Sequence, residues 1–297
     1  MSGDVLARFL LESSNVRGEF IQLDETWQEI LQRANYPDPV RRLLGEAVSA
    51  VALMAATIKF DGSLILQIRG SGPVHMLVAQ STGKHTLRGL ARWRGDDVVD
   101  GTLPELIGEG QMIITIDPGP GKDRYQSIIN LDGDSLAEAL DQYFLNSEQL
   151  PTRFWLASNA QRCAGFLLQR LPKGKASVEE VEPDDEAWNY SVAVSETLTE
   201  EEMLGWPAPE LLRRLFPEHP VRLFDGPTFT FRCGCSREVI ETTLRALGPV
   251  ELAETLHQEG VIRVDCEFCA ARYDFDAVDV EQLFASQAIT PADETRH

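Results

Sequence analysis

The chain has 297 residues, of which 43% are hydrophobic, and it carries a formal net charge of −20 with a pI near 4.6. This composition supplies enough apolar surface for a core and excludes global disorder. A surface this acidic is poorly suited to binding phosphate backbones or anionic lipid. We therefore expect neither nucleic acid nor a membrane as a partner.

Residues 1–9 contain neither a basic leader nor a long apolar run, which predicts that no signal peptide is present. The longest apolar stretch, residues 47–58, falls short of the roughly 20 residues that span a bilayer. We therefore expect a cytoplasmic protein. In that compartment clustered cysteines are more often metal ligands or redox centres than structural bridges.

Residues 1–176 are predicted to form one large α/β domain. Residues 40–59 are rich in Ala, Leu and Val on nearly all sides, which predicts a helix buried between layers. Asp134 is expected to cap an amphipathic helix over 135–144. Cys163 lies in an apolar strand context and is most simply a small buried side chain. Strands are expected over 63–68, 74–79, 111–116, 125–129, 153–157 and 165–169.

Residues 177–222 differ in composition and are predicted to form a helical, acidic linker. Carboxylates clustered at 179–186 and 200–202 repel one another and weaken a compact state. Large apolar side chains such as Trp188 are interleaved with them, which is unusual for a free linker. We expect a segment that lies on the main domain but is held there only marginally, with a short amphipathic helix over 210–216.

Residues 223–297 are predicted to form a small C-terminal zinc-binding domain. The fold class predicted for the whole chain is therefore α+β, with a large N-terminal α/β domain of mixed sheets, a helical acidic linker and a small four-cysteine domain. The elements expected in the small domain are a strand over 228–231, a helix over 237–247 with Ser236 as its N-cap, a helix over 252–258, and strands over 261–264 and 273–275.

Two close pairs of cysteines lie in this domain, Cys233 with Cys235 and Cys266 with Cys269. Two such pairs supply the four sulfur donors that one tetrahedral Zn²⁺ ion requires, so these four residues are the predicted metal ligands and zinc the predicted cofactor. A domain this small has little core, and a structural metal would supply much of its stability. Gly234 lets the backbone fold back, so each pair could also close as a local disulfide.

A cage that can be either a metal site or two disulfides is a candidate redox switch. A purely structural zinc site and a constitutive pair of disulfides are the alternatives. His257 lies between the pairs and could replace a sulfur, although an exposed helix histidine is the simpler interpretation. Four thiolates on one Zn²⁺ leave a net charge of −2, which neighbouring arginines could offset, namely Arg232, Arg237, Arg263 and Arg272.

No enzymatic motif accompanies the cysteines, and we predict that the protein is not an enzyme. Residues 119–123 lack the glycine spacing and the Ser/Thr of a phosphate-binding loop. One alternative is a zinc-ribbon adaptor that binds nucleic acid or an assembly partner, which the acidic charge disfavours. Another is a thiol–disulfide oxidoreductase that uses Cys266 and Cys269. Such a pair normally opens a helix, whereas here a strand precedes it and another is expected to follow.

The cysteine pattern, together with Tyr273 and Phe275 after it, resembles the 33 kDa heat-shock chaperone family, the redox-regulated bacterial holdases. Segments 70–73, 143–144, 147–152, 165–169 and 171–172 are also similar to that family. The resemblance implies an ATP-independent chaperone that is inactive when reduced and zinc-bound. It further implies that oxidation under unfolding stress forms Cys233–Cys235 and Cys266–Cys269 disulfides and expels zinc. The zinc domain and the linker would then unfold, and a homodimer would bind unfolding client proteins.

Overall fold

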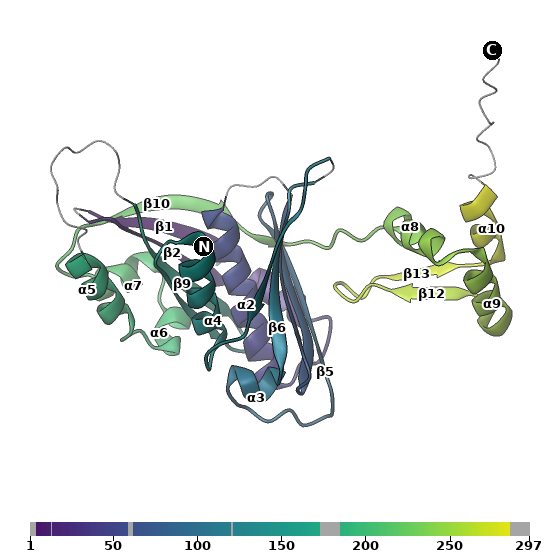
Figure 1. The fold of residues 1–297 in the computed structure, drawn as a ribbon, viewed down its shortest axis with the longest axis horizontal. Helices are drawn as coiled ribbons and strands as arrows, with labels where there is room; N and C mark the ends of the chain where they lie inside the picture. Colours follow the sequence, from purple (N-terminus) through teal and green to yellow (C-terminus); the bar gives the residue numbers. More distant parts are fainter. Residues whose placement is uncertain (1–3, 13, 59–61, 120, 173–184, 286–297) are drawn as a thin grey trace, which may run out of the picture. The chain divides into compact units, whose positions relative to one another are not determined.

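The computed structural model describes residues 4–12, 14–58, 62–119, 121–172 and 185–285. The chain divides into two compact units, Met1–Arg232 and Cys233–His297, whose elements are labelled in Figure 1. Both units contain helices and a sheet, which confirms the predicted α+β class. Within the described ranges, no helix has both the length and the apolar composition that crossing a bilayer requires.

One long helix, α2 (Asp38–Thr57), lies between the two sheets of the first unit (Figure 1). Every side chain from Leu43 to Ala55 is buried, because opposite sides of the helix pack against different sheets. A Cβ at Gly45 would lie 2.0 Å from Oγ of Ser158, so glycine permits this close approach. The prediction of a helix buried between layers is confirmed, although its predicted last residue, Lys59, lies outside the described residues.

The first sheet is antiparallel throughout. Its last two strands confirm those predicted over 153–157 and 165–169. Val5 pairs with Thr228, so the sheet joins the two ends of the first unit. In spatial order its strands are β10 (Val221–Thr228), β1 (Val5–Leu11), β2 (Val16–Leu23), β9 (Cys163–Arg170) and β8 (Thr152–Ser158).

The second sheet is mixed, because its first two strands pair in parallel and the others are antiparallel. Four of its strands confirm the strands predicted over 63–68, 74–79, 111–116 and 125–129. In spatial order the strands are β11 (Thr230–Phe231), β5 (Thr86–Trp93), β4 (Val74–Thr82), β3 (Ser63–Gly70), β6 (Gly110–Asp117) and β7 (Tyr125–Asn130).

Shorter helices complete the first unit around these layers. The helix expected to start after Asp134 instead has Ser135 as its N-cap, whose Oγ accepts a hydrogen bond from the backbone N–H of Glu138 at 3.2 Å. The helix therefore begins one residue later than predicted, because a serine hydroxyl reaches the free N–H groups of its first turn. These elements are α1 (Glu25–Leu31), α3 (Leu103–Ile107), α4 (Leu136–Tyr143) and the π-helical turn η1 (Phe144–Glu148).

Three further helices cover the face of the first sheet opposite α2: α5 (Asp185–Ser195), α6 (Glu200–Gly205) and α7 (Ala208–Leu215) (Figure 1). With the strands they form a second apolar cluster, separate from the one around α2. The helix predicted over 210–216 is confirmed as α7. Residues 177–184 of the predicted linker lie outside the described residues, and the marginal hold on the main domain stays a prediction.

The boundary between the units differs from the one predicted at residue 223. Strand β10 runs across that position and pairs with β1, and β11 pairs with β5, so residues 223–232 belong to the first unit. The strand expected over 228–231 is divided at Phe229, whose side chain is fully buried. The second unit therefore begins at Cys233.

Over residues 233–285, the second unit consists of a two-stranded antiparallel sheet and three helices. Its apolar core contains six buried side chains, among them Leu252 and Phe275. Ser236 caps the first helix, as predicted, since its Oγ accepts from the N–H of Val239 at 3.4 Å. The elements are α8 (Arg237–Leu247), α9 (Pro249–Glu259), β12 (Ile262–Asp265), β13 (Arg272–Phe275) and α10 (Ala277–Ala285).

Candidate metal centre

Two turns of the second unit carry the four cysteines. Cys233 and Cys235 lie in the segment before α8, and Cys266 and Cys269 lie in the turn between β12 and β13. In that turn the N–H of Ala270 donates to the carbonyl of Cys266 at 2.7 Å, and Ala270 adopts a left-handed φ of 56°. The bond closes the chain into a tight loop, which directs both sulfurs of the second pair toward one point.

The four sulfur atoms form a compact cage, with all Sγ atoms within 4.8 Å of one another. The Sγ atoms of Cys233 and Cys266 are 3.6 Å apart, and those of Cys235 and Cys269 are 3.2 Å apart. Zn–S bonds of about 2.3 Å in a tetrahedron place sulfurs about 3.8 Å apart. The structure thus brings together the four cysteines that the sequence predicted as ligands, and the cage fits one ion with four sulfur ligands.

Protonation of the thiols is strongly coupled because they lie so close together. Burial, together with hydrogen bonds to the neighbouring sulfurs, raises the pKa of Cys269 to about 12. Burial also opposes ionisation of Cys235, but hydrogen bonds from Tyr273 and the other cysteines outweigh it and lower its pKa to about 7. Four thiolates at this spacing therefore require a cation, which a metal bound at the cage would supply.

Tyr273 is a residue of the site whose role the sequence did not indicate. Its hydroxyl donates to Sγ of Cys235 at 3.3 Å from strand β13, which follows directly after the second cysteine pair. The bond to the sulfur raises the pKa of Tyr273 to about 12. The signal available in the sequence was an aromatic residue four positions after Cys269, at the start of an expected strand.

Three of the four arginines expected to balance the cage contact carboxylates of the second unit. Arg237 pairs with Asp279 at 2.7 Å and lies over the ring of Phe275, with 4.3 Å from its guanidinium carbon to the ring centroid. Arg272 pairs with Asp265 at 2.8 Å. Arg263 contacts Asp274 at 3.9 Å, and Arg232 belongs to the first unit. These contacts commit arginine charge to carboxylates on the strands and helices around the site.

Two other candidates lie outside the cage. His257 is exposed on α9, which agrees with the simpler of its two interpretations. Cys163 is fully buried in β9 of the first unit, and burial raises its pKa to about 12. A buried thiol that holds its proton is a poor nucleophile and a poor metal ligand. The prediction that it is a small core side chain is confirmed.

Comparison with known proteins gives one consistent family. The model of the family described as Hsp33 protein matches residues 4–276. The 33 kDa chaperonin of Nitrosococcus oceani is 48% identical over 294 residues, which cover 99% of each chain. The 33 kDa chaperonin of Ectopseudomonas mendocina is 45% identical over 297 residues and also covers 99% of each chain.

A solved structure shares the fold. The crystal structure of the 33 kDa chaperonin, a heat shock protein 33 homolog, from Thermotoga maritima superposes with a TM-score of 0.78. The match covers 97% of this chain and 100% of that one at 23% sequence identity. At this identity the likeness supports the arrangement of elements, whereas the relatives above also support the family.

Proposed function

The chain belongs to the Hsp33 protein family, and from that premise we propose that it is a redox-regulated, ATP-independent chaperone that holds unfolding proteins. The observation that carries the proposal is the cage of four cysteine sulfurs within 4.8 Å of one another, in a unit whose described residues include six buried core side chains. A unit so small depends on its centre, so chemistry at four sulfurs can change the fold of all its elements.

In the reduced, resting protein, Cys233, Cys235, Cys266 and Cys269 hold one zinc ion. A zinc ion held there would keep the four sulfurs deprotonated and would cross-link the two turns. The chain's own contribution is to place the sulfurs, through the bond between Ala270 and Cys266 and the cap of α8 by Ser236. In this state the chaperone is inactive.

Oxidation of the cysteines removes the metal ligands, and the second unit then loses the stabilisation that the metal supplies. Two thiolates lose two electrons to a peroxide, which takes up two protons and leaves as two waters while one S–S bond forms. Two such events convert all four thiolates. We propose the pairing Cys233–Cys235 and Cys266–Cys269, as family membership implies. Disulfide mapping must also look for cross-pair bonds, because the Sγ atoms of Cys235 and Cys269, which belong to different pairs, lie 3.2 Å apart.

The client-binding surface is proposed to lie under and on α5–α7. Strands of the first sheet present aromatic side chains to these helices, with the Phe9 and Phe166 rings 5.6 Å apart and Phe20 beside them. Leu212 and Phe216 from the α7 segment pack on this face. If the helices leave, a contiguous apolar surface becomes exposed, which is what binding of unfolded chains requires.

Light scattering of a thermally unfolding client protein tests the proposal. One sample is reduced and zinc-loaded, and the other is treated with peroxide at elevated temperature. We expect suppression of aggregation by the oxidised sample alone, reversed by dithiothreitol. Equal behaviour of the two samples would overturn the redox switch and would favour the zinc-ribbon adaptor instead. Size-exclusion chromatography with light scattering checks the proposed homodimer of the oxidised form.

An oxidoreductase is a weaker candidate. Cys266 and Cys269 lie between two antiparallel strands, and the catalytic thiol pairs of that class open a helix that lowers the thiol pKa. We therefore propose that the protein is not an enzyme. We also propose that it resides in the cytoplasm and that its partners are unfolding proteins, with neither nucleic acid nor membrane among them. An assay with insulin as a reducible substrate tests the enzymatic alternative, and we expect no turnover.

A further inference from the structure

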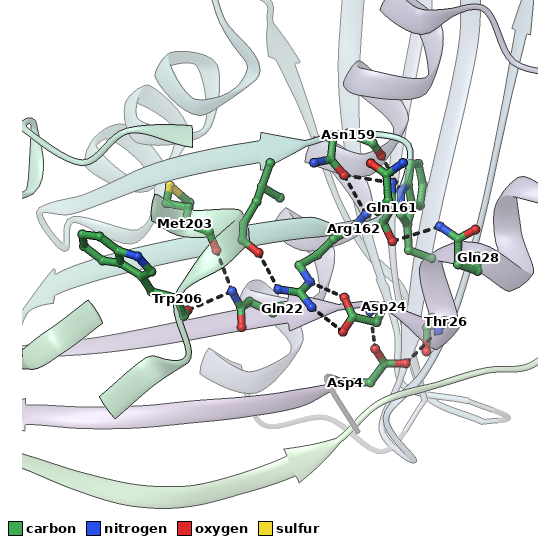
Figure 2. A network of polar contacts seen from close by, with 12 residues as sticks. Asp4, Gln22, Asp24, Thr26, Gln28, Asn159, Gln161, Arg162, Met203 and Trp206 are labelled. Atoms are coloured by element: carbon green, nitrogen blue, oxygen red, sulfur yellow. Dashed lines mark hydrogen bonds and ion pairs between the residues drawn. The ribbon is translucent and has the colours of Figure 1, made fainter. Parts of the chain in front are cut away.

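The C-terminal end of α6 is tied to the first sheet by side-chain hydrogen bonds to its carbonyl groups (Figure 2). Nε2 of Gln22 donates to the carbonyl of Met203 at 2.8 Å and to that of Trp206 at 2.9 Å. Nη1 of Arg162 donates to the carbonyl of Leu204 at 2.5 Å. Carbonyls at a helix end have no partner within the helix, so these bonds satisfy groups that would otherwise need water.

Contacts outside α6 also hold the Arg162 side chain in place. Its Nη2 donates to Oδ2 of Asp24 at 2.8 Å and its Nε pairs with the other carboxylate oxygen, a two-point contact that sets the plane of the guanidinium (Figure 2). Oδ1 of Asn159 accepts from the Arg162 N–H at 2.8 Å, and the Asn159 carbonyl accepts from Nε1 of Trp27 at 2.9 Å. The β8–β9 turn is therefore anchored to α1 and presents the side chain in one orientation.

Asp24 is tied in turn to the segment that leads to the cysteines. The carboxylate of Asp4 accepts from the N–H groups of Asp24 at 2.5 Å and Thr26 at 2.7 Å, and Asp4 is 4% exposed. The backbone carbonyl of Asp4 accepts from the N–H of Phe229 at 2.8 Å. Phe229 is fully buried and stands four residues before Cys233, the first cysteine of the cage.

We propose that Gln22, Asp24 and Arg162, here called the α6 clamp, lock α5–α7 on the first sheet in the reduced protein. We further propose that Asp4 connects this clamp to the strap 229–232. The inference rests on the proposed function and specifies its regulation. When the second unit unfolds, the strap loses its continuation, Phe229 can leave its site, and Asp4 no longer holds Asp24 and Arg162 in place.

Beyond the buried side chain of Phe229, the attachment of the strap is short, which suits it to this role. β11 is two residues long and its pairing with β5 is the parallel one in its sheet. The N–H groups of Thr230 and Arg232 donate to the carbonyls of His85 and Leu87, each at 3.1 Å. An edge pair of this length opens at little cost compared with a central strand.

The test uses the full chain and hydrogen exchange of the peptide that covers residues 200–206. In reduced, zinc-loaded protein, Arg162→Gln should accelerate hydrogen exchange of α6 by about tenfold or more. The variant loses the charge-assisted hydrogen bond from Arg162 to the α6 carbonyl and the ion pair that orients it. Zinc content should not change, and aggregation of a client should be partly suppressed without oxidant. Arg41→Gln, which breaks an ion pair with Asp38 on α2, is the matched control and should behave as wild type.

Coupling to the strap is tested by removing zinc with a chelator in both backgrounds. Chelation should accelerate α6 exchange strongly in wild type and little in Arg162→Gln, where the clamp is already open. An equal factor in the two backgrounds would overturn the coupling and favour transmission along α7 and β10. Unchanged α6 exchange in a folded Arg162→Gln protein would overturn the clamp itself. If that variant does not fold, Gln22→Ala gives the same test, with unchanged α6 exchange again the contrary result.

The exchange data separate this inference from the proposed function. They measure release of α6 whether or not a client is present. Failure of oxidised wild type to suppress aggregation would overturn the chaperone proposal, and accelerated α6 exchange in Arg162→Gln would still support the clamp.

Discussion

The hydroxyl of Tyr273 and the sulfur of Cys235 lie 3.3 Å apart, with the hydroxyl as donor. The bond connects the strand after the second cysteine pair to a sulfur of the first pair. Hydrogen bonds to a ligating sulfur fix its orientation and stabilise its thiolate form. With a metal bound by the four cysteines, Tyr273 would therefore support the centre without being a ligand itself.

Tyr273→Phe should weaken zinc binding by about 10- to 100-fold, the usual effect of losing a partner of a metal ligand. The ring and its packing are kept, so the loss reports the hydroxyl alone. Competition with a chromophoric chelator in reducing buffer measures the change. Tyr125→Phe, an exposed tyrosine of the first unit, is the control and should bind zinc as wild type does. Equal zinc affinity in Tyr273→Phe would contradict this role.

Zinc removal under reducing conditions should unfold the second unit and leave the core of the first unit folded. Structural zinc contributes about 10–16 kcal/mol in small zinc-binding peptides, against a net stability of about 5–15 kcal/mol for a typical domain. The six-residue core of this unit is too small to replace that contribution. Hydrogen exchange after chelation should show loss of protection over residues 237–285 and retained protection in α2. Retained protection in α8–α10 would show that the metal is dispensable for folding.

The sequence predicted the elements whose signal is local. Helix α2 is apolar on nearly all sides, and the cysteine pairs lie in turns between short elements, so both were recognised without knowledge of distant contacts. Strands β1 and β2 were missed because Arg8 and Glu19 interrupt their apolar pattern. In the fold the Arg8 Nη2 donates to the carbonyl of Ala56 at 2.9 Å, and Glu19 is 3% exposed beside it. The two side chains pair with each other at 3.5 Å, and Thr57 of α2 donates to Glu19 at 3.3 Å, contacts that a strand pattern cannot reveal.

The boundary of the second unit and the α6 clamp depend on contacts between distant parts of the chain. Residues 223–228 look like the start of the cysteine domain, yet they pair with β1 at the other end of the first unit. Arg162 and Gln22 carry no local signal, since their partners are backbone carbonyls about 40 and 180 residues away along the chain. The chemistry of single residues was sufficient to predict that the four cysteines form a cage. It was insufficient to predict the side chains that hold α5–α7 on the first sheet.

Thiol alkylation should count the cysteines by environment. The native, reduced, zinc-loaded protein should react slowly, because its four cage sulfurs would be bound to the metal and Cys163 is buried with a pKa raised to about 12 by that burial. After chelation four thiols should react, and under denaturing conditions all five. Mass spectrometry of the alkylated protein gives the counts. Cys163→Ala should leave the four-thiol count after chelation intact, and rapid labelling of Cys163 in the native protein would contradict its place in the core.

Stability of the first unit should depend on pH through Glu46. This carboxyl is 7% exposed on α2, and burial, opposed by Arg42 and reinforced by Glu200, raises its pKa from 4.5 to about 7. Between these values the folded state binds more protons than the unfolded state. Stability is therefore lost as pH rises from about 4.5 to about 7, by up to about 3 kcal/mol for this group.

Glu46→Gln fixes the group in a neutral form, and Arg42 keeps its 2.7 Å contact with Asp100. Urea unfolding at pH 5 and pH 8 should show a smaller loss of stability in the variant than in wild type, with the difference concentrated above pH 5. All five tryptophans lie at or before residue 206, so their fluorescence follows the first unit alone. Glu19 and Asp141 also have pKa values raised to about 7 by burial, so part of the pH dependence should persist. Glu29→Gln, at an exposed ion pair, should retain the wild-type dependence, and the same dependence in Glu46→Gln would exclude Glu46 as a source.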